Sequence, residues 1–195
     1  MRSTHILAGI ASAGLVATSL VMGAPASARD VINGTGGHDN LTGTPFADTI
    51  RGFKGRDRIQ GLAGPDLIFG GNGQGKLFAG RGDDTIRGGG YGDFLSGGLG
   101  DDTMYSRADG DGIEGGAGSD VLFGGIEPDF LFDGPGTDTI YGGLGNDEVQ
   151  LTKDGTPDTV HCGVGHDVVL GATSENTIAA DCEEVHVELP PPGAP

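Results

Sequence analysis

Aspartate recurs every nine residues through most of this chain, and this spacing points to metal chemistry. Fourteen positions spaced by nine run from Asp30 to Asp147; thirteen are Asp, and the exception is Gly75. Carboxylate oxygens are the ligands that hard divalent cations prefer, and the free carbonyl groups of glycine-rich turns can complete such a site. Flexible loops that offer only oxygen suit Ca²⁺ better than Mg²⁺ or a transition metal. The spacing therefore predicts several calcium ions bound in series.

The aspartates belong to a longer repeat, G-G-x-G-x-D-x-U-x, in which U is aliphatic or Met. The x-U-x segment predicts a three-residue strand whose central side chain points inward, and the glycines predict tight turns. Two units make one coil of 18 residues, so that residue i lies over residue i+18 at a strand spacing of about 4.8 Å. We therefore predict an all-β fold, a parallel β-roll or β-helix solenoid. The U positions are Ile32, Leu41, Ile50, Ile59, Ile68, Leu77, Ile86, Leu95, Met104, Ile113, Leu122, Leu131, Ile140 and Val149.

Successive aspartates fall on opposite edges of this roll, which we name edge A and edge B. From Asp66 onward, edge A keeps a glycine two residues before each aspartate. Edge B replaces this glycine with Tyr91, Asp109 and Glu127. Because these residues disfavour a left-handed turn, and because edge B loses one aspartate at Gly75, we expect the best calcium sites on edge A. The predicted ligands are Asp48, Asp66, Asp84, Asp102, Asp120 and Asp138 on edge A, and Asp39, Asp57, Asp93, Asp129 and Asp147 on edge B.

The composition describes a chain that cannot fold on hydrophobic burial alone. It has 41 Gly and 10 Pro among 195 residues and a formal net charge of −17. Such chains are typically disordered, and stacked aspartates would repel one another without a counter-ion. A single aspartate here could be a turn former that bonds its own backbone. Over the whole series we expect calcium binding and folding to be one event, and the acidic charge argues against a nucleic-acid partner.

The repeat resembles the RTX, or hemolysin-type, calcium-binding nonapeptide family. Clear copies begin at Gly97, Gly115 and Gly142, and the likeness covers residues 30 to 150 well and 151 to 178 loosely. The resemblance implies a calcium-dependent β-roll. RTX toxins and proteases share only this repeat domain with the chain, so their activities are not implied.

The first 28 residues have the features of a secretory signal peptide: Arg2, an apolar stretch over 6–22 and a small-residue cleavage site that ends at Ala28. The apolar stretch is short for a bilayer span, and no other segment predicts one. We expect cleavage after Ala28 and a secreted, extracellular protein without a membrane span. The predicted division is a signal peptide over 1–28, the β-roll over 29–150, a cap of degenerate repeats over 151–189 and a disordered tail over 190–195.

Cys162 and Cys182 are the chain's two cysteines. An even number in an exported chain favours a disulfide over two free thiols. The two residues stand about one coil apart, in a segment where the register slips by two residues after Gln150. The pair would clip the last coil and cap the open end of the roll. The sequence around both cysteines resembles the ends of secreted repeat proteins from high-GC Gram-positive (actinobacterial) bacteria.

Aromatic side chains follow several U positions at multiples of eighteen residues: Phe69, Tyr105, Phe123 and Tyr141. They could form a strip for a cell-surface or polysaccharide partner; we favour an outward ladder that supports the stacking of coils. The histidines have no fixed partner spacing and are expected at the surface, rather than as zinc ligands or catalytic bases.

No catalytic motif occurs in the sequence, so we predict no catalytic residues and no enzymatic activity. The expected function is that of a calcium-binding structural or surface-interaction module. The alternative is a polysaccharide-acting enzyme, lyase-like or epimerase-like, on a parallel β-helix. Enzymes of that type usually have longer coils and more aromatic and basic residues.

Overall fold

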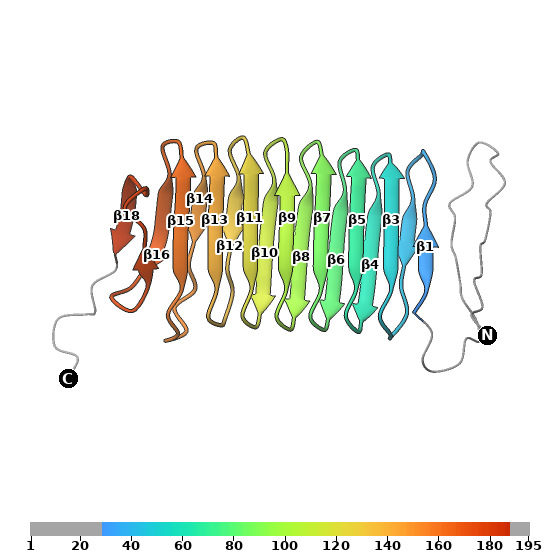
Figure 1. Ribbon diagram of the computed structural model, residues 1–195, viewed down its shortest axis with the longest axis horizontal. Helices are drawn as coiled ribbons and strands as arrows, with labels where there is room; N and C mark the ends of the chain where they lie inside the picture. The colour runs from blue at the N-terminus through green and yellow to red at the C-terminus, as the bar shows by residue number, and fades with distance from the viewer. Residues whose placement is uncertain (1–28, 188–195) are drawn as a thin grey trace.

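The computed structural model describes residues 29–187, so the predicted signal peptide and the tail lie outside the described residues. Its eighteen strands form a solenoid that confirms the predicted all-β parallel architecture (Figure 1). The described residues include no helix long and apolar enough to cross a membrane. The strands pair into two parallel sheets of nine strands each, one holding the odd-numbered and one the even-numbered strands.

Each sheet takes its strands in chain order, so neighbours in a sheet belong to successive coils. The odd-numbered sheet contains β1 (Val31–Asn33), β3 (Thr49–Lys54), β5 (Leu67–Asn72), β7 (Thr85–Gly90), β9 (Thr103–Arg107), β11 (Val121–Ile126), β13 (Thr139–Leu144), β15 (Thr159–Val164) and β17 (Thr177–Ile178). The even-numbered sheet contains β2 (Asn40–Thr42), β4 (Arg58–Ala63), β6 (Lys76–Arg81), β8 (Phe94–Leu99), β10 (Gly112–Ala117), β12 (Phe130–Phe132), β14 (Glu148–Gln150), β16 (Val168–Ala172) and β18 (Glu184–Val187).

The pairing register follows the predicted period. Ile68 pairs with Ile86, 18 residues on, and the same step holds along both sheets up to β13 and β14. Between β13 and β15 the step becomes 20, and Ile140 pairs with Val160. The two inserted residues lie in the long turn between β14 and β15. Beyond it β15 and β17 pair again at a step of 18, whereas β16 and β18 pair at a step of 16 with an irregularity between Val169 and Ala172.

Most strands are longer than the expected three residues, because they extend through the first two positions of the next repeat, which are often glycine. In β5, Ile68 and Gly70 both point inward and are buried, and Gly71 has a φ of 105°. Each strand of this length therefore has two inward positions, one large and one small. The large side chains fill the core, and the small residues leave space beneath the turns.

The turns between strands form two rows along the solenoid, and these rows are edge A and edge B (Figure 1). Edge A turns lead from an even-numbered strand to the next odd-numbered one and end in residues such as Asp66 and Asp84. Edge B turns lead from odd to even and end in residues such as Asp93 and Asp111. Every aspartate of a row therefore lies next to its counterpart in the neighbouring coil.

Stacked rings run along the outer face of the odd-numbered sheet. The ring centroids of Tyr105 and Phe123 are 4.7 Å apart, those of Phe123 and Tyr141 4.8 Å, and the planes are nearly parallel. His161 continues the stack 5.0 Å beyond Tyr141, and the Arg87 guanidinium lies 5.5 Å from the Tyr105 ring centre. Neighbouring rings cover one another's faces, so this arrangement supports coil stacking rather than a flat surface for sugar rings.

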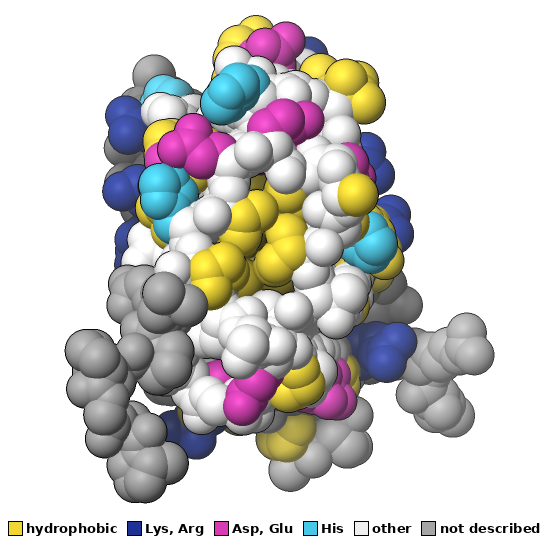
Figure 2. Space-filling view, turned by 90° about the vertical axis from the view of Figure 1, so that its left-hand side faces the viewer, with side chains coloured by type: hydrophobic (Ala, Val, Ile, Leu, Met, Phe, Trp, Pro, Cys, Tyr) yellow, Lys and Arg dark blue, Asp and Glu magenta, His cyan; other side chains and the backbone are white. Residues whose placement is uncertain are grey.

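Hydrophobic core side chains are visible at the C-terminal end of the solenoid (Figure 2). Figure 2 looks onto this end, where hydrophobic side chains gather at the centre and acidic ones lie above and below them. Ile178, Cys182 and Val185 pack against the buried core. The predicted disulfide between Cys162 and Cys182 is present, with a Cα–Cα distance of 5.1 Å.

Replacing both cysteines with alanine is expected to lower the free energy of unfolding of the calcium-loaded chain by about 2–5 kcal/mol. The reason is that the disulfide closes a loop between residues 20 positions apart, and it ties β15 to the segment before β18. Urea unfolding of the variant and the parent chain in saturating calcium measures the effect. An unchanged unfolding midpoint would contradict a stabilising role for the disulfide.

Candidate metal centre

A ladder of hydrogen bonds fixes the aspartates of each edge. The backbone N–H of Asp84 donates to Asp102 Oδ1 at 2.8 Å, and the N–H of Asp102 donates to Asp120 Oδ1 at 2.8 Å. Edge B repeats the pattern, with the N–H of Asp111 donating to Asp129 Oδ1 at 2.8 Å. Each rung joins two coils, so one oxygen of every such carboxylate serves the fold itself.

The second oxygen, Oδ2, has no hydrogen-bond partner in ten of these aspartates within the described part of the chain. The residues are at most 5% exposed, so water does not compensate for the missing partner. A buried, unpartnered carboxylate oxygen is strongly unfavourable, and a regular series of them indicates that a ligand satisfies them. The ten are Asp66, Asp84, Asp102, Asp120 and Asp138 on edge A, and Asp93, Asp111, Asp129, Asp147 and Asp167 on edge B.

Carbonyl oxygens of the following coil lie beside these carboxylates. A Cβ atom built on Gly124 would stand 2.7 Å from Asp129 Oδ2 and 2.5 Å from the carbonyl oxygen of Gly142. At Gly142 itself, a Cβ would stand 2.6 Å from Asp147 Oδ2 and 2.5 Å from the carbonyl oxygen of Cys162. Oxygens from two coils thus surround a small space that glycine keeps open. This all-oxygen donor set fits Ca²⁺.

Burial changes the protonation of these carboxyl groups. Desolvation raises the pKa of Asp102 to about 8, and repulsion from Asp84 and Asp120 acts in the same direction, while the Asp84 N–H bond opposes it. Desolvation also raises the pKa of Asp66 and of Asp93 to about 7. The ionised form is unfavourable in this environment unless a positive charge accompanies it.

The first coils satisfy Oδ2 in another way. Thr44 donates to Asp48 Oδ2 from its N–H at 2.6 Å and from its hydroxyl at 3.0 Å. Thr35 donates its N–H to Asp39 Oδ2 at 2.6 Å. Asp39 and Asp48 therefore lie in the predicted rows, but neutral donors occupy the oxygens that are unpartnered elsewhere. We expect these two predicted ligands to bind calcium more weakly than the central ones.

The last coil ends the edge A ladder with an amide instead of a carboxylate. Asn176 stands at the aspartate position of its repeat and donates Nδ2–H to Asp158 Oδ2 at 2.8 Å. On edge B, Glu183 accepts the N–H of Asp167 at 2.9 Å. At the end of edge A, Asp158 Oδ2 thus has a hydrogen-bond donor, whereas Asp167 Oδ2 at the end of edge B is still unpartnered.

All eleven predicted ligands are buried in the two rows of turns, but the prediction missed others in the same environment. Asp111, which is not among the predicted ligands, has the same unpartnered Oδ2 as its neighbours. Asp158 and Asp167 continue the rows beyond the two-residue insertion. The D-x-U triplet identifies Asp158 and Asp167 in the sequence, because it is present in Asp158-Thr159-Val160 and Asp167-Val168-Val169.

Edge B keeps its turn geometry despite the lost glycines. Tyr91, Asp109 and Glu127 adopt φ values of 70°, 68° and 74°. A non-glycine residue in this region costs roughly 1–3 kcal/mol, which the surrounding ladder must offset. Since unpartnered oxygens occur on both edges, the preference for edge A rests on this strain and on the missing carboxylate at Gly75, and it stays a prediction.

Comparison with known families agrees with this geometry. The family described as RTX calcium-binding nonapeptide repeat matches over residues 27–50, 33–64, 51–86, 78–113 and 114–149. A comparison with curated proteins finds no significant match. The family matches extend over more than half of the chain and include nine of the ten aspartates with unpartnered oxygens, Asp167 being the exception. The chain belongs to the RTX calcium-binding nonapeptide repeat family.

Proposed function

We propose that this chain is a secreted calcium-binding module whose coils fold as they take up calcium. The observation that carries the proposal is the series of ten buried Oδ2 atoms without hydrogen-bond partners. Calcium, when bound, supplies the positive charge that lets two neighbouring carboxylates stay ionised at close range. The aspartates hold adjacent coils together through it, and the glycines keep the space open.

The folding contribution of the core alone is small. One large inward side chain per strand forms a narrow apolar strip between the two sheets, while the 37 glycines of residues 29–187 must be ordered. Ordering so flexible a backbone opposes folding by about 1–2 kcal/mol per residue. The free energy of metal binding therefore becomes part of the free energy of folding.

We propose no catalytic role for the carboxylates. The ten with unpartnered oxygens are at most 5% exposed, so they do not face a groove that a polysaccharide could occupy. A structural or surface-interaction role is the function that these features support best. A cell-surface or polysaccharide partner stays a prediction.

Secretion is supported by the disulfide, because such bonds persist in oxidising compartments outside the cytoplasm. We propose that residues 1–28 are removed, that residues 29–150 are the roll and that 151–189 cap it. Mass spectrometry of the exported protein should find Arg29 as its first residue. A retained N-terminal segment would contradict the predicted cleavage.

Equilibrium dialysis followed by elemental analysis tests the proposed function. The full chain at pH 7.5 should retain several calcium ions and should not retain magnesium at the same concentration. Fewer than two bound calcium ions at millimolar free calcium would contradict the proposal.

Substituting Asp102→Asn is expected to weaken calcium binding more than Asp111→Asn. Both residues have neighbours with unpartnered oxygens, but the turn before Asp111 places Asp109 at a φ of 68°, whereas the turn before Asp102 has Gly100 at the equivalent position. Calorimetric titration of both variants measures the difference. Asp101→Asn is the matched control, because Asp101 is exposed and asparagine can still accept the Ser119 N–H. Equal losses for Asp102→Asn and Asp111→Asn would contradict the preference for edge A.

A further inference from the structure

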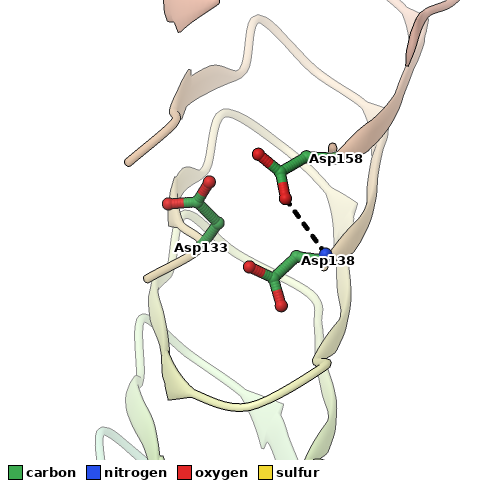
Figure 3. Close-up of side chains that lie close together, drawn as sticks. All are labelled: Asp133, Asp138 and Asp158. Carbon is green, nitrogen blue, oxygen red and sulfur yellow. Dashed lines mark hydrogen bonds between the residues drawn. The ribbon is translucent and has the colours of Figure 1, made fainter. Parts of the chain in front are cut away.

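Three aspartates meet where the coil period changes from 18 to 20 residues. One oxygen from each of Asp133, Asp138 and Asp158 lies within 4.8 Å of the others (Figure 3). All three residues are at most 1% exposed. Three like charges this close in a buried position cannot all be ionised without a compensating positive charge.

Asp133 is the unusual member of this cluster. It follows β12 directly, at the inward position that holds a small residue in the preceding coils. The equivalent residues there, spaced by 18, are Gly61, Ala79, Gly97 and Gly115. In those coils a carbonyl oxygen and one carboxylate border the space that the missing side chain leaves open. Here the carboxylate of Asp133 enters that space and adds a third negative charge.

The inserted turn holds Asp133 in place. The N–H of Thr152 donates to both Asp133 oxygens, at 2.9 and 3.0 Å. The same turn contacts the neighbouring coil through Asp154, whose Oδ2 accepts the N–H of Gly136 at 2.6 Å. The N–H of Gly134 also donates to Asp133 Oδ1 at 2.5 Å, whereas Oδ2 accepts no backbone N–H other than that of Thr152. Because each carboxylate oxygen has two lone pairs, Asp133 Oδ2 is the oxygen of this residue that can ligate a cation.

Asp138 provides an independent indication of a ligand. Its Oδ1 accepts the N–H of Asp120 at 2.7 Å, whereas its Oδ2 is buried and has no partner in the described structure. Figure 3 shows its carboxylate directed toward Asp133. Asp158 completes the cluster and accepts the N–H of Asp138 at 3.1 Å.

We propose that Asp133, Asp138 and Asp158 together make the edge A turn at Asp138 a divalent-cation site that binds calcium more tightly than the ordinary turns of this chain. This inference rests on the proposed function. Calcium affinity rises with the number of charged ligands, and three carboxylates meet here where the ordinary turns place one carboxylate beside a carbonyl oxygen. The site links the inserted turn, residues 151–158, to the preceding coil, and so joins the disulfide-bonded end to the rest of the roll.

Calcium titration of the full chain against a chromophoric chelator of known affinity tests the proposal. The parent chain should show one ion bound at least tenfold more tightly than the remaining ions. Asp133→Asn removes the charge but keeps an acceptor for the Thr152 N–H, and Asp133→Gly restores the residue of the ordinary coils. Both variants should lose the tight ion and keep the weaker class.

Asp154→Asn is the matched control, since it removes one negative charge from the same turn without removing a carboxylate of the cluster. It should keep the tight ion. Circular dichroism in saturating calcium shows whether each variant is folded. If Asp133→Gly does not fold, Asp133→Asn alone tests the proposal. A single affinity class in the parent chain, survival of the tight ion in Asp133→Asn, or its equal loss in Asp154→Asn would overturn this inference. Those outcomes leave the proposed function intact, whereas a parent chain that binds no calcium overturns both.

Discussion

Lowering the pH from 8 to 5 is expected to weaken calcium binding to this chain at least tenfold. The pKa of Asp102 is raised to about 8 and those of Asp129 and Asp138 to about 7, chiefly by desolvation. At pH 5 protons therefore occupy carboxylates that must be ionised to ligate the cation. Calorimetric titration at pH 8, 7, 6 and 5 measures the change, and titration in buffers of different ionisation enthalpy counts the protons released.

The calcium-free chain should respond to pH in the opposite direction. A carboxyl group whose folded pKa lies above its unfolded value of 3.8 contributes stability that is present below pH 4. That contribution is lost as the pH rises through the folded pKa values, here about 6 to 8. Acid should thus increase the β-structure of the chain in chelator. Two results would contradict the claim that burial raises the pKa of these aspartates. One is a calcium affinity that does not change with pH, and the other is a calcium-free fold that acid destabilises between pH 8 and pH 6.

Substituting Gly97→Val is expected to abolish calcium binding at one turn and to lower the free energy of unfolding by about 1–3 kcal/mol. A Cβ at this position would stand 2.5 Å from the Gly115 carbonyl oxygen and would conflict with Asp102 Oδ2. Ala79 shows that the equivalent position accepts a single methyl group, but the two methyl groups of valine enter the space between the donor oxygens. Dialysis with elemental analysis counts the ions, and urea unfolding in saturating calcium measures stability.

Gly36→Val provides the control for this substitution. No atom lies within 4 Å of a Cβ built on Gly36, and its φ is not in the left-handed region. The control should keep the full number of ions and change stability by less than about 0.5 kcal/mol. If Gly97→Val retained every ion with unchanged affinity, the space between Asp102 and Gly115 would not be a calcium site.

The period of nine was sufficient to predict the solenoid and its edges. The D-x-U spacing predicted that Asp102 would lie over Asp84, because residues 18 apart must stack in a parallel coil. The two cysteines predicted the disulfide for a similar reason, since they stand about one coil apart. Regular repetition makes such contacts local in the folded structure even when they are distant in the chain.

Other features depend on neighbours that a single repeat does not reveal. The strands run through glycines that have low strand propensity, because backbone pairing with the coils on both sides outweighs that preference, as in β5. The threonines that satisfy Asp39 and Asp48 occupy variable repeat positions. The Asp133 cluster could not be predicted from the repeat, because it forms only if β13 and β15 pair across the two-residue insertion.

Circular dichroism of the chain from Arg29 onward, recorded at pH 7.5 during a calcium titration, tests the coupling of calcium binding to folding most directly. We expect a disordered spectrum in chelator, a cooperative gain of β-structure between about 10⁻⁴ and 10⁻³ M calcium, the range typical of extracellular modules, and no such change with magnesium. A chain that already has its full β-structure in chelator would contradict calcium-coupled folding.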